Sequence, residues 1–128
     1  GQADHYVTLG KANQIQQALL NIFINAKDAI LASRKSGALQ PYEEGRIDIN
    51  LSLQDDYVMI KIQDNGGGIP ESILGRIFQP YFTTKHESVG TGIGLYMTKT
   101  IIERQMGGSI TAYNRKNGAI FTIRLPHE

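Results

Sequence analysis

The stretch from Asp64 to Pro70 constrains this chain most, because an acid and three consecutive glycines directly follow an apolar strand. Alternation in that strand places Val58, Ile60 and Ile62 on one face, and Asp64 continues the series. The carboxylate is therefore expected on the core side, where an unpaired charge is costly. The glycines permit a sharp turn and the close approach of a flat ligand, and Pro70 can begin a short helix.

Taken alone, the same stretch favours a simpler interpretation, a tight turn that carries a stray acid. Asp-Asn-Gly is a common turn signal. A binding role for Asp64 therefore needs support from other parts of the sequence.

Composition narrows the possible classes of protein. The 128 residues suffice for one compact domain with a core, expected over 1–128 with 1–10 as a terminal linker. The net charge of +1 provides no strong field for nucleic acid or a membrane surface. The absence of cysteine excludes disulfides and thiolate metal sites. No apolar run approaches the roughly 20 residues of a membrane span, and no signal peptide is recognisable.

Residues 12–34 are predicted to form a long helix with two distinct stripes. Its core face has apolar residues at helical spacing: Ile15, Leu19, Ile22, Phe23, Ala26 and Ile30. A polar stripe follows a narrow arc beside it: Gln17, Asn21, Asn25 and Asp28. Asparagine is a poor interior helix residue, so two of them one turn apart favour side chains that face a ligand, with a solvated face as the alternative. A neutral amide oxygen suits Mg²⁺ shared with phosphates.

The remaining pattern alternates strands and helices. Tyr6–Leu9 is a weak candidate for a strand end, and 36–45 is a loop. Alternating residues predict a hairpin of strands 47–53, with one buried face, and 57–64. A short helix over 71–78, a helix from the glycines at 90–94 to Met106, and a second hairpin of strands 109–114 and 119–125 follow. This order predicts an α+β fold, a two-layer α/β sandwich with helices on one face of a mixed, mostly antiparallel sheet.

Two further segments are candidates for ligand binding. Residues 79–89 lack periodicity, and loops of this length inside a compact domain are often functional lids. Gly90-Thr91-Gly92-Ile93-Gly94-Leu95 opens a helix, where free N–H groups and the helix dipole favour an anion. The segment matches neither the Walker nor the dinucleotide-binding pattern, so residues 90–95 are a weak signal by themselves.

Together, in this order, the four stretches closely resemble the nucleotide-binding boxes of the GHKL superfamily, which has the Bergerat fold. The resemblance is to the catalytic ATP-binding domain of sensor histidine kinases and covers roughly residues 10–126. The segment 21–29 resembles the asparagine box, and 78–85 resembles the phenylalanine box with the start of an ATP lid over 79–91. Each box is weak alone, but the ordered set is specific.

The resemblance implies roles for individual residues. Asn25 would hold Mg²⁺ between the phosphates, and Asn21 and Lys85 would support or neutralise them, so these three are the candidate catalytic residues. Asp64 would accept the adenine amino hydrogen, with Gly66, Gly68 and Ile69 beside the base. The other residues implied in ATP or ADP binding are Asp28, Phe82, Thr84, Gly90, Thr91, Gly92, Ile93, Gly94 and Leu95.

Two departures from the family pattern stand out. Many relatives have Thr where this chain has Ala119, and Thr122 cannot replace it because Phe121 is expected to face inward and Thr122 outward. The phosphoacceptor histidine of the family lies on a separate helical domain, and His5, His86 and His127 lie outside any such helix.

The function implied is an ATP-dependent protein histidine kinase of a two-component system, delivering the γ-phosphate to a histidine on a separate domain. An ATPase switch and an anti-sigma-type serine kinase are the alternatives; relatives that hydrolyse ATP carry Glu where this chain has Asn21, and an amide cannot act as that base. The implied partners are the phosphoacceptor domain and a response regulator, with no nucleic acid and no direct membrane contact. The resemblance implies a cytoplasmic, monomeric isolated domain within a homodimeric parent that is soluble or membrane-anchored.

Overall fold

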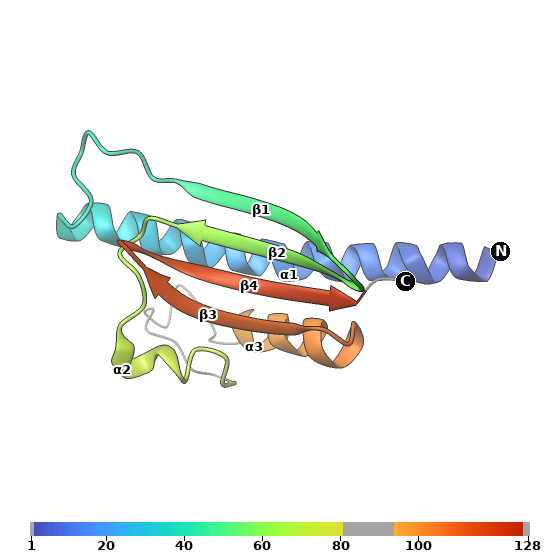
Figure 1. Ribbon diagram of the computed structural model, residues 1–128. Helices are drawn as coiled ribbons and strands as arrows, with labels where there is room; N and C mark the ends of the chain where they lie inside the picture. The colour runs from blue at the N-terminus through green and yellow to red at the C-terminus, as the bar shows by residue number, and fades with distance from the viewer. Residues whose placement is uncertain (1, 81–93, 127–128) are drawn as a thin grey trace.

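Residues 2–80 and 94–126 are described by the computed structural model, with side chains from residue 12 onward. The helices are α1 (Gln2–Ser36), α2 (Glu71–Leu74) and α3 (Gly94–Lys99), and α3 continues into a π-helical segment, η1 (Thr100–Gln105). The strands are β1 (Ile47–Gln54), β2 (Tyr57–Asp64), β3 (Ser109–Arg115) and β4 (Gly118–Pro126). Figure 1 shows the four strands as one sheet with α1 running along its back.

The sheet has the strand order β1-β2-β4-β3, and each of its three pairs is antiparallel. Two hairpins are therefore joined through their inner strands, β2 and β4. Ile62 lies opposite Phe121 and Gln63 opposite Ile120, so the end of β2 at Asp64 meets the start of β4. This pairing brings the Asp64–Pro70 stretch next to the turn between β3 and β4.

The core lies between one face of this sheet and the helices, which confirms the predicted two-layer α+β fold. Ala18 and Ile22 of α1 and Ile101 and Ile102 of η1 pack with the inward residues of the strands, among them Ile60, Ile62, Ile110, Phe121 and Ile123. Phe78 closes one side of the core with its ring edge-on to that of Phe121, the ring centroids being 6.2 Å apart. The central position of β4 buries both of its faces, since Ile120 and Thr122 are buried as well.

Three predicted elements differ from the structure. Tyr6–Leu9, a candidate strand end, lies within α1, because extending a helix adds one hydrogen bond per residue, whereas a strand needs a partner. The helix predicted over 71–78 ends at Leu74, since Gly75 is a poor helix residue and the chain continues in tight turns. The helix to Met106 has π-type geometry in its second half, where the Met106 N–H donates to the Ile101 carbonyl.

Strand β1 contradicts the prediction of one buried face. Ile47, Ile49, Leu51 and Leu53 lie opposite inward residues of β2, yet each is exposed. β1 is an edge strand, and among the described elements none covers its apolar side. Alternation shows which residues share a face, but whether another element covers that face depends on the tertiary structure.

Within the described residues, no helix is both long enough and apolar enough to cross a bilayer.

Thr122 provides a test of the packing of β4. Its Oγ1 is buried and has no hydrogen-bond partner among the described residues. As predicted, it lies on the face opposite Phe121, but it is buried there. Thr122→Val removes the buried hydroxyl at nearly constant volume and is expected to raise the free energy of unfolding by about 1 kcal/mol. Urea denaturation measures this, and a loss of stability would mean that the hydroxyl has a partner in solution.

Candidate functional site

Asp64 is the only acidic residue among the buried polar groups of the described residues, with 6% of its surface exposed. Its Oδ1 accepts hydrogen bonds from the Gly66 N–H at 2.9 Å and the Ala119 N–H at 3.4 Å. Within the described part of the chain, both of these hydrogen bonds reach the same carboxylate oxygen, Oδ1. Burial raises the pKa of Asp64, and the two backbone hydrogen bonds counteract that rise in part.

The glycines after Asp64 are required by close packing and by backbone conformation. A Cβ on Gly66 would lie 2.8 Å from the Ala29 Cβ, so this residue packs directly on α1. Gly67 and Gly68 have φ values of +94° and +82°, which side chains other than glycine rarely adopt. On the other side, a Cβ on Gly118 would overlap the carbonyl oxygen of Asp64. The loop is therefore wedged between α1 and the β3–β4 turn.

Side chains and backbone groups from both sides hold the loop of residues 65–70, called the glycine loop from here on, in place. From α1, the Ser33 hydroxyl donates to the Gly66 carbonyl. From the β3–β4 turn, the Asn117 carbonyl accepts from the Gly67 N–H at 2.7 Å. From β3, the Asn114 side chain accepts from the Ile69 N–H at 2.7 Å. Neither Ser33 nor Asn114 belongs to a recognisable motif, and both act on the backbone of distant residues, so the sequence pattern gives no signal for their roles.

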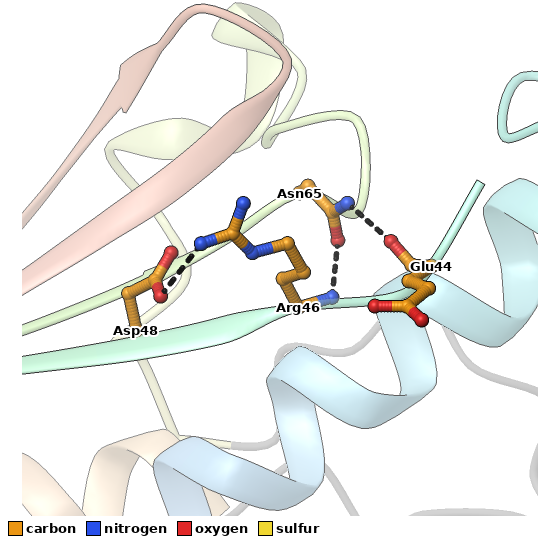
Figure 2. A network of polar contacts seen from close by, with 4 residues as sticks. All are labelled: Glu44, Arg46, Asp48 and Asn65. Carbon is orange, nitrogen blue, oxygen red and sulfur yellow. Dashed lines mark hydrogen bonds and ion pairs between the residues drawn. The ribbon is translucent and has the colours of Figure 1, made fainter.

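Asn65 anchors the segment before β1 to the same loop, as Figure 2 shows. Its Nδ2 donates to the Glu44 carbonyl at 2.8 Å, and its Oδ1 accepts from the Arg46 N–H at 2.7 Å. Arg46 in turn forms an exposed ion pair with Asp48 at 3.3 Å. The Asp-Asn-Gly turn thus uses its asparagine for structure and leaves its buried aspartate for another role.

Asn21 and Asn25 of α1 make different hydrogen bonds. The Asn21 Nδ2 donates to the Gly94 carbonyl at the start of α3, at 3.2 Å. The Asn25 Nδ2 donates to the Asn21 carbonyl at 2.8 Å, so this amide folds back on its own helix. This bond engages the amide nitrogen of Asn25 and not its Oδ1. Asp28, one turn from Asn25 on the same stripe, forms an ion pair with Lys27 at 3.8 Å.

Helix α1 connects the two ends of the candidate site. Asn21 contacts the start of α3, and Ala29 contacts Gly66 of the glycine loop. These positions are eight residues apart, which corresponds to roughly 12 Å along a helix.

Several predicted site residues lie elsewhere or outside the described residues. The partly buried side chain of Leu95 packs against the core. Phe82, Thr84, Lys85, Gly90, Thr91, Gly92 and Ile93, with the predicted lid, lie outside the described residues. Residues 12–80 and 94–126 contain no group of three or more His, Cys, Asp or Glu side chains that could hold a metal ion. A cation here would rely on neutral oxygens and on oxygens of the ligand, which is a donor set that Mg²⁺ accepts.

Comparison with known proteins gives consistent results. Residues 10–128 match the family described as histidine kinase-, DNA gyrase B- and HSP90-like ATPase. The two-component sensor PprA of Pseudomonas aeruginosa is 40% identical over 94% of this chain, which covers 12% of that protein. The sensor protein FixL of Bradyrhizobium diazoefficiens is 33% identical over 88% of the chain, covering 20% of that protein. The chain thus spans a fifth or less of the length of these relatives.

Solved structures agree with the sequence comparison. The nucleotide-free catalytic domain of histidine kinase ThkA superposes with a TM-score of 0.72 and 35% identity, over 89% of this chain and 67% of that one. The mycobacterial sensor histidine kinase MprB, at 24% identity and a TM-score of 0.67, shares the fold. The chain therefore belongs to the histidine kinase-, DNA gyrase B- and HSP90-like ATPase family, as the ATP-binding catalytic domain of a sensor histidine kinase.

Proposed function

We propose that this domain binds Mg·ATP between α1, the glycine loop and the start of α3, and presents the γ-phosphate to a histidine on a separate domain of its parent protein. The observation that carries this proposal is the buried Asp64 carboxylate, with Oδ1 held by two backbone N–H groups and Oδ2 left to accept. Burying a carboxylate is unfavourable unless its oxygens are paired or hydrogen-bonded, and a ligand could supply the donor that Oδ2 lacks among the described residues. The adenine amino group is a donor that matches this oxygen.

The phosphate end is proposed at Asn21, Asn25 and the start of α3. Mg²⁺ would neutralise phosphate charge, and Asn25 would hold it through its amide oxygen, with phosphate oxygens and water as the other ligands. Asn21 fixes the Gly94 carbonyl and so orients the first turn of α3. Phosphoryl transfer depends mainly on positioning and charge neutralisation; Asn21 and Asn25 would contribute to positioning, and Mg²⁺ would supply the positive charge.

ATP hydrolysis as an independent function is the second candidate, since the family also includes ATPases. Asn21 counts against it, because its amide is engaged with Gly94 and has no basic group to activate water. We therefore favour transfer of the γ-phosphate to the phosphoacceptor domain of the same parent protein, which would then pass it to a response regulator.

We further propose that the parent protein is a homodimer, that the isolated domain is a monomer, and that both act in the cytoplasm.

The metal role of Asn25 can be tested by calorimetry. Asn25→Ala removes the proposed amide ligand, and Asn25→Asp replaces it with a charged one. ATP binding to the wild type is expected to weaken at least tenfold when Mg²⁺ is chelated, while Asn25→Ala should show a much smaller dependence on Mg²⁺. Equal affinity for all proteins with and without Mg²⁺ would exclude this role.

The adenine role of Asp64 predicts a change in base selectivity. Asp64→Asn keeps the shape but removes a charge-assisted hydrogen bond of about 1.5–3 kcal/mol, so ATP affinity should fall roughly 10- to 100-fold. Guanine presents a carbonyl at the corresponding position, so the wild type should prefer ATP to GTP and the variant should lose much of that preference. Competition against a fluorescent ADP analogue measures both affinities. If the ratio of ATP to GTP affinity is unchanged in the variant, Asp64 does not recognise adenine and has only a structural role in the turn.

The raised pKa of Asp64 predicts how stability depends on pH. The folded protein holds this proton more tightly than the unfolded chain, whose reference pKa is 3.8. The stabilisation from protonation is complete below that value and is lost as pH rises through the folded pKa. Asp64→Asn lacks this titration, so the unfolding free energy of the wild type should fall relative to that of the variant as pH rises above about 3.8. Urea denaturation across this range measures the difference, and a constant difference would contradict the shift.

A further inference from the structure

Asn114 of β3 makes an unusually complete contact with the backbone of Ile69. Its Oδ1 accepts from the Ile69 N–H at 2.7 Å, and its Nδ2 donates to the Ile69 carbonyl at 2.6 Å. The same Nδ2 lies 3.3 Å from Oε1 of Glu71. One side chain thus satisfies both backbone groups of a loop residue 45 positions away. An amide is suited to this task because it carries a donor and an acceptor side by side.

The glycine loop is shaped to admit this side chain. A Cβ on Gly68 would lie 2.9 Å from the Asn114 Oδ1, so a larger residue there would push the amide away. Gly68 also has a φ of +82°, a backbone conformation that residues with a side chain rarely adopt. The contact between Asn114 and Ile69 is therefore built jointly by the loop and the strand.

Asn114 and Ala119 form a direct cross-strand pair between β3 and β4. The Ala119 N–H holds Asp64 Oδ1, while the Asn114 side chain holds Ile69. These two contacts fix the two groups that our proposed function assigns to adenine, the hydrogen-bond acceptor and the apolar wall. One pair of opposed residues therefore sets the distance between them.

We propose that Asn114 is a positioning residue for nucleotide selectivity, which holds Ile69 at the spacing from Asp64 that a flat adenine base requires. This inference rests on the proposed function. Without the amide, the Ile69 backbone loses both of its side-chain hydrogen bonds, and only packing against the core restrains the residue. Ile69 can then shift away from Asp64, so the base loses its wall while the phosphate end at Asn21 and Asn25 is unaffected. Asn114 itself need not touch the nucleotide.

The test measures two ratios of affinities by competition against a fluorescent ADP analogue. The ATP/GTP ratio reports the base end, and the ATP/ADP ratio reports the phosphate end. Neither ratio depends on the fraction of folded protein, because that fraction scales all affinities equally. The variants are Asn114→Ala and Asn114→Asp. The aspartate keeps the shape and one acceptor but places a second carboxylate oxygen against the Ile69 carbonyl and Glu71. Ile110→Val, which removes a buried methyl from the same strand, is the matched control.

Both Asn114 variants are expected to weaken ATP binding about tenfold, with a similar fall in the ATP/GTP ratio and an ATP/ADP ratio within about twofold of the wild type. The control should leave both ratios unchanged. Hydrogen exchange should show the Ile69 amide exchanging faster in Asn114→Ala than in the control. If Asn114→Ala does not fold, the near-isosteric Asn114→Asp carries the test.

Unchanged ATP/GTP ratios in the Asn114 variants would overturn the inference, as would an equal fall in the Ile110→Val control. If Asp64→Asn alters selectivity but the Asn114 variants do not, the proposed function stands and only the role of Asn114 is lost. If the wild type does not bind ATP, the proposed function fails, and this inference fails with it.

Discussion

The burial of the Asp64 carboxylate is the constraint on which the rest of the site depends. Taking an acid out of water is unfavourable, and the raised pKa reflects that cost. The fold places the acid where β2 meets β4, so that backbone N–H groups of Gly66 and Ala119 orient it. The close approach of Gly118 to the Asp64 carbonyl makes this junction possible. The burial of Asp64 thus lowers the stability of the fold and places a hydrogen-bond acceptor in a fixed position.

Helix α1 combines a structural role with a binding role along its length. One face buries Ala18, Ile22 and Ala26 in the core, and an adjacent stripe carries Asn21 and Asn25. Its later turns support the glycine loop through Ala29 and Ser33. Because a helix is rigid and has a fixed rise, it sets the distance between the loop and the start of α3. The two ends of the site are therefore positioned by one element.

Local pattern predicted the elements best where periodicity was strong. The helix of residues 12–34, the two hairpins and their order follow from spacing and turn residues, and the structure confirms them. Asp64 was correctly placed on the core side because it continues an alternating series. Local pattern did not predict burial or helix length where tertiary packing decides them. Examples are the exposed apolar face of β1, the burial of Thr122 and the early end of α2.

The sequence by itself determined the residue types and their spacing: a buried acid before glycines, amides one turn apart on a helix, and the boxes of a known family. These are properties of neighbouring residues, so alternation and helical periodicity reveal them. Only the tertiary structure decided that β2 pairs with β4 and that Asn114 reaches Ile69. Such contacts join residues far apart in the chain, and an amide that bonds to backbone leaves no pattern, because any residue offers the same N–H and C=O.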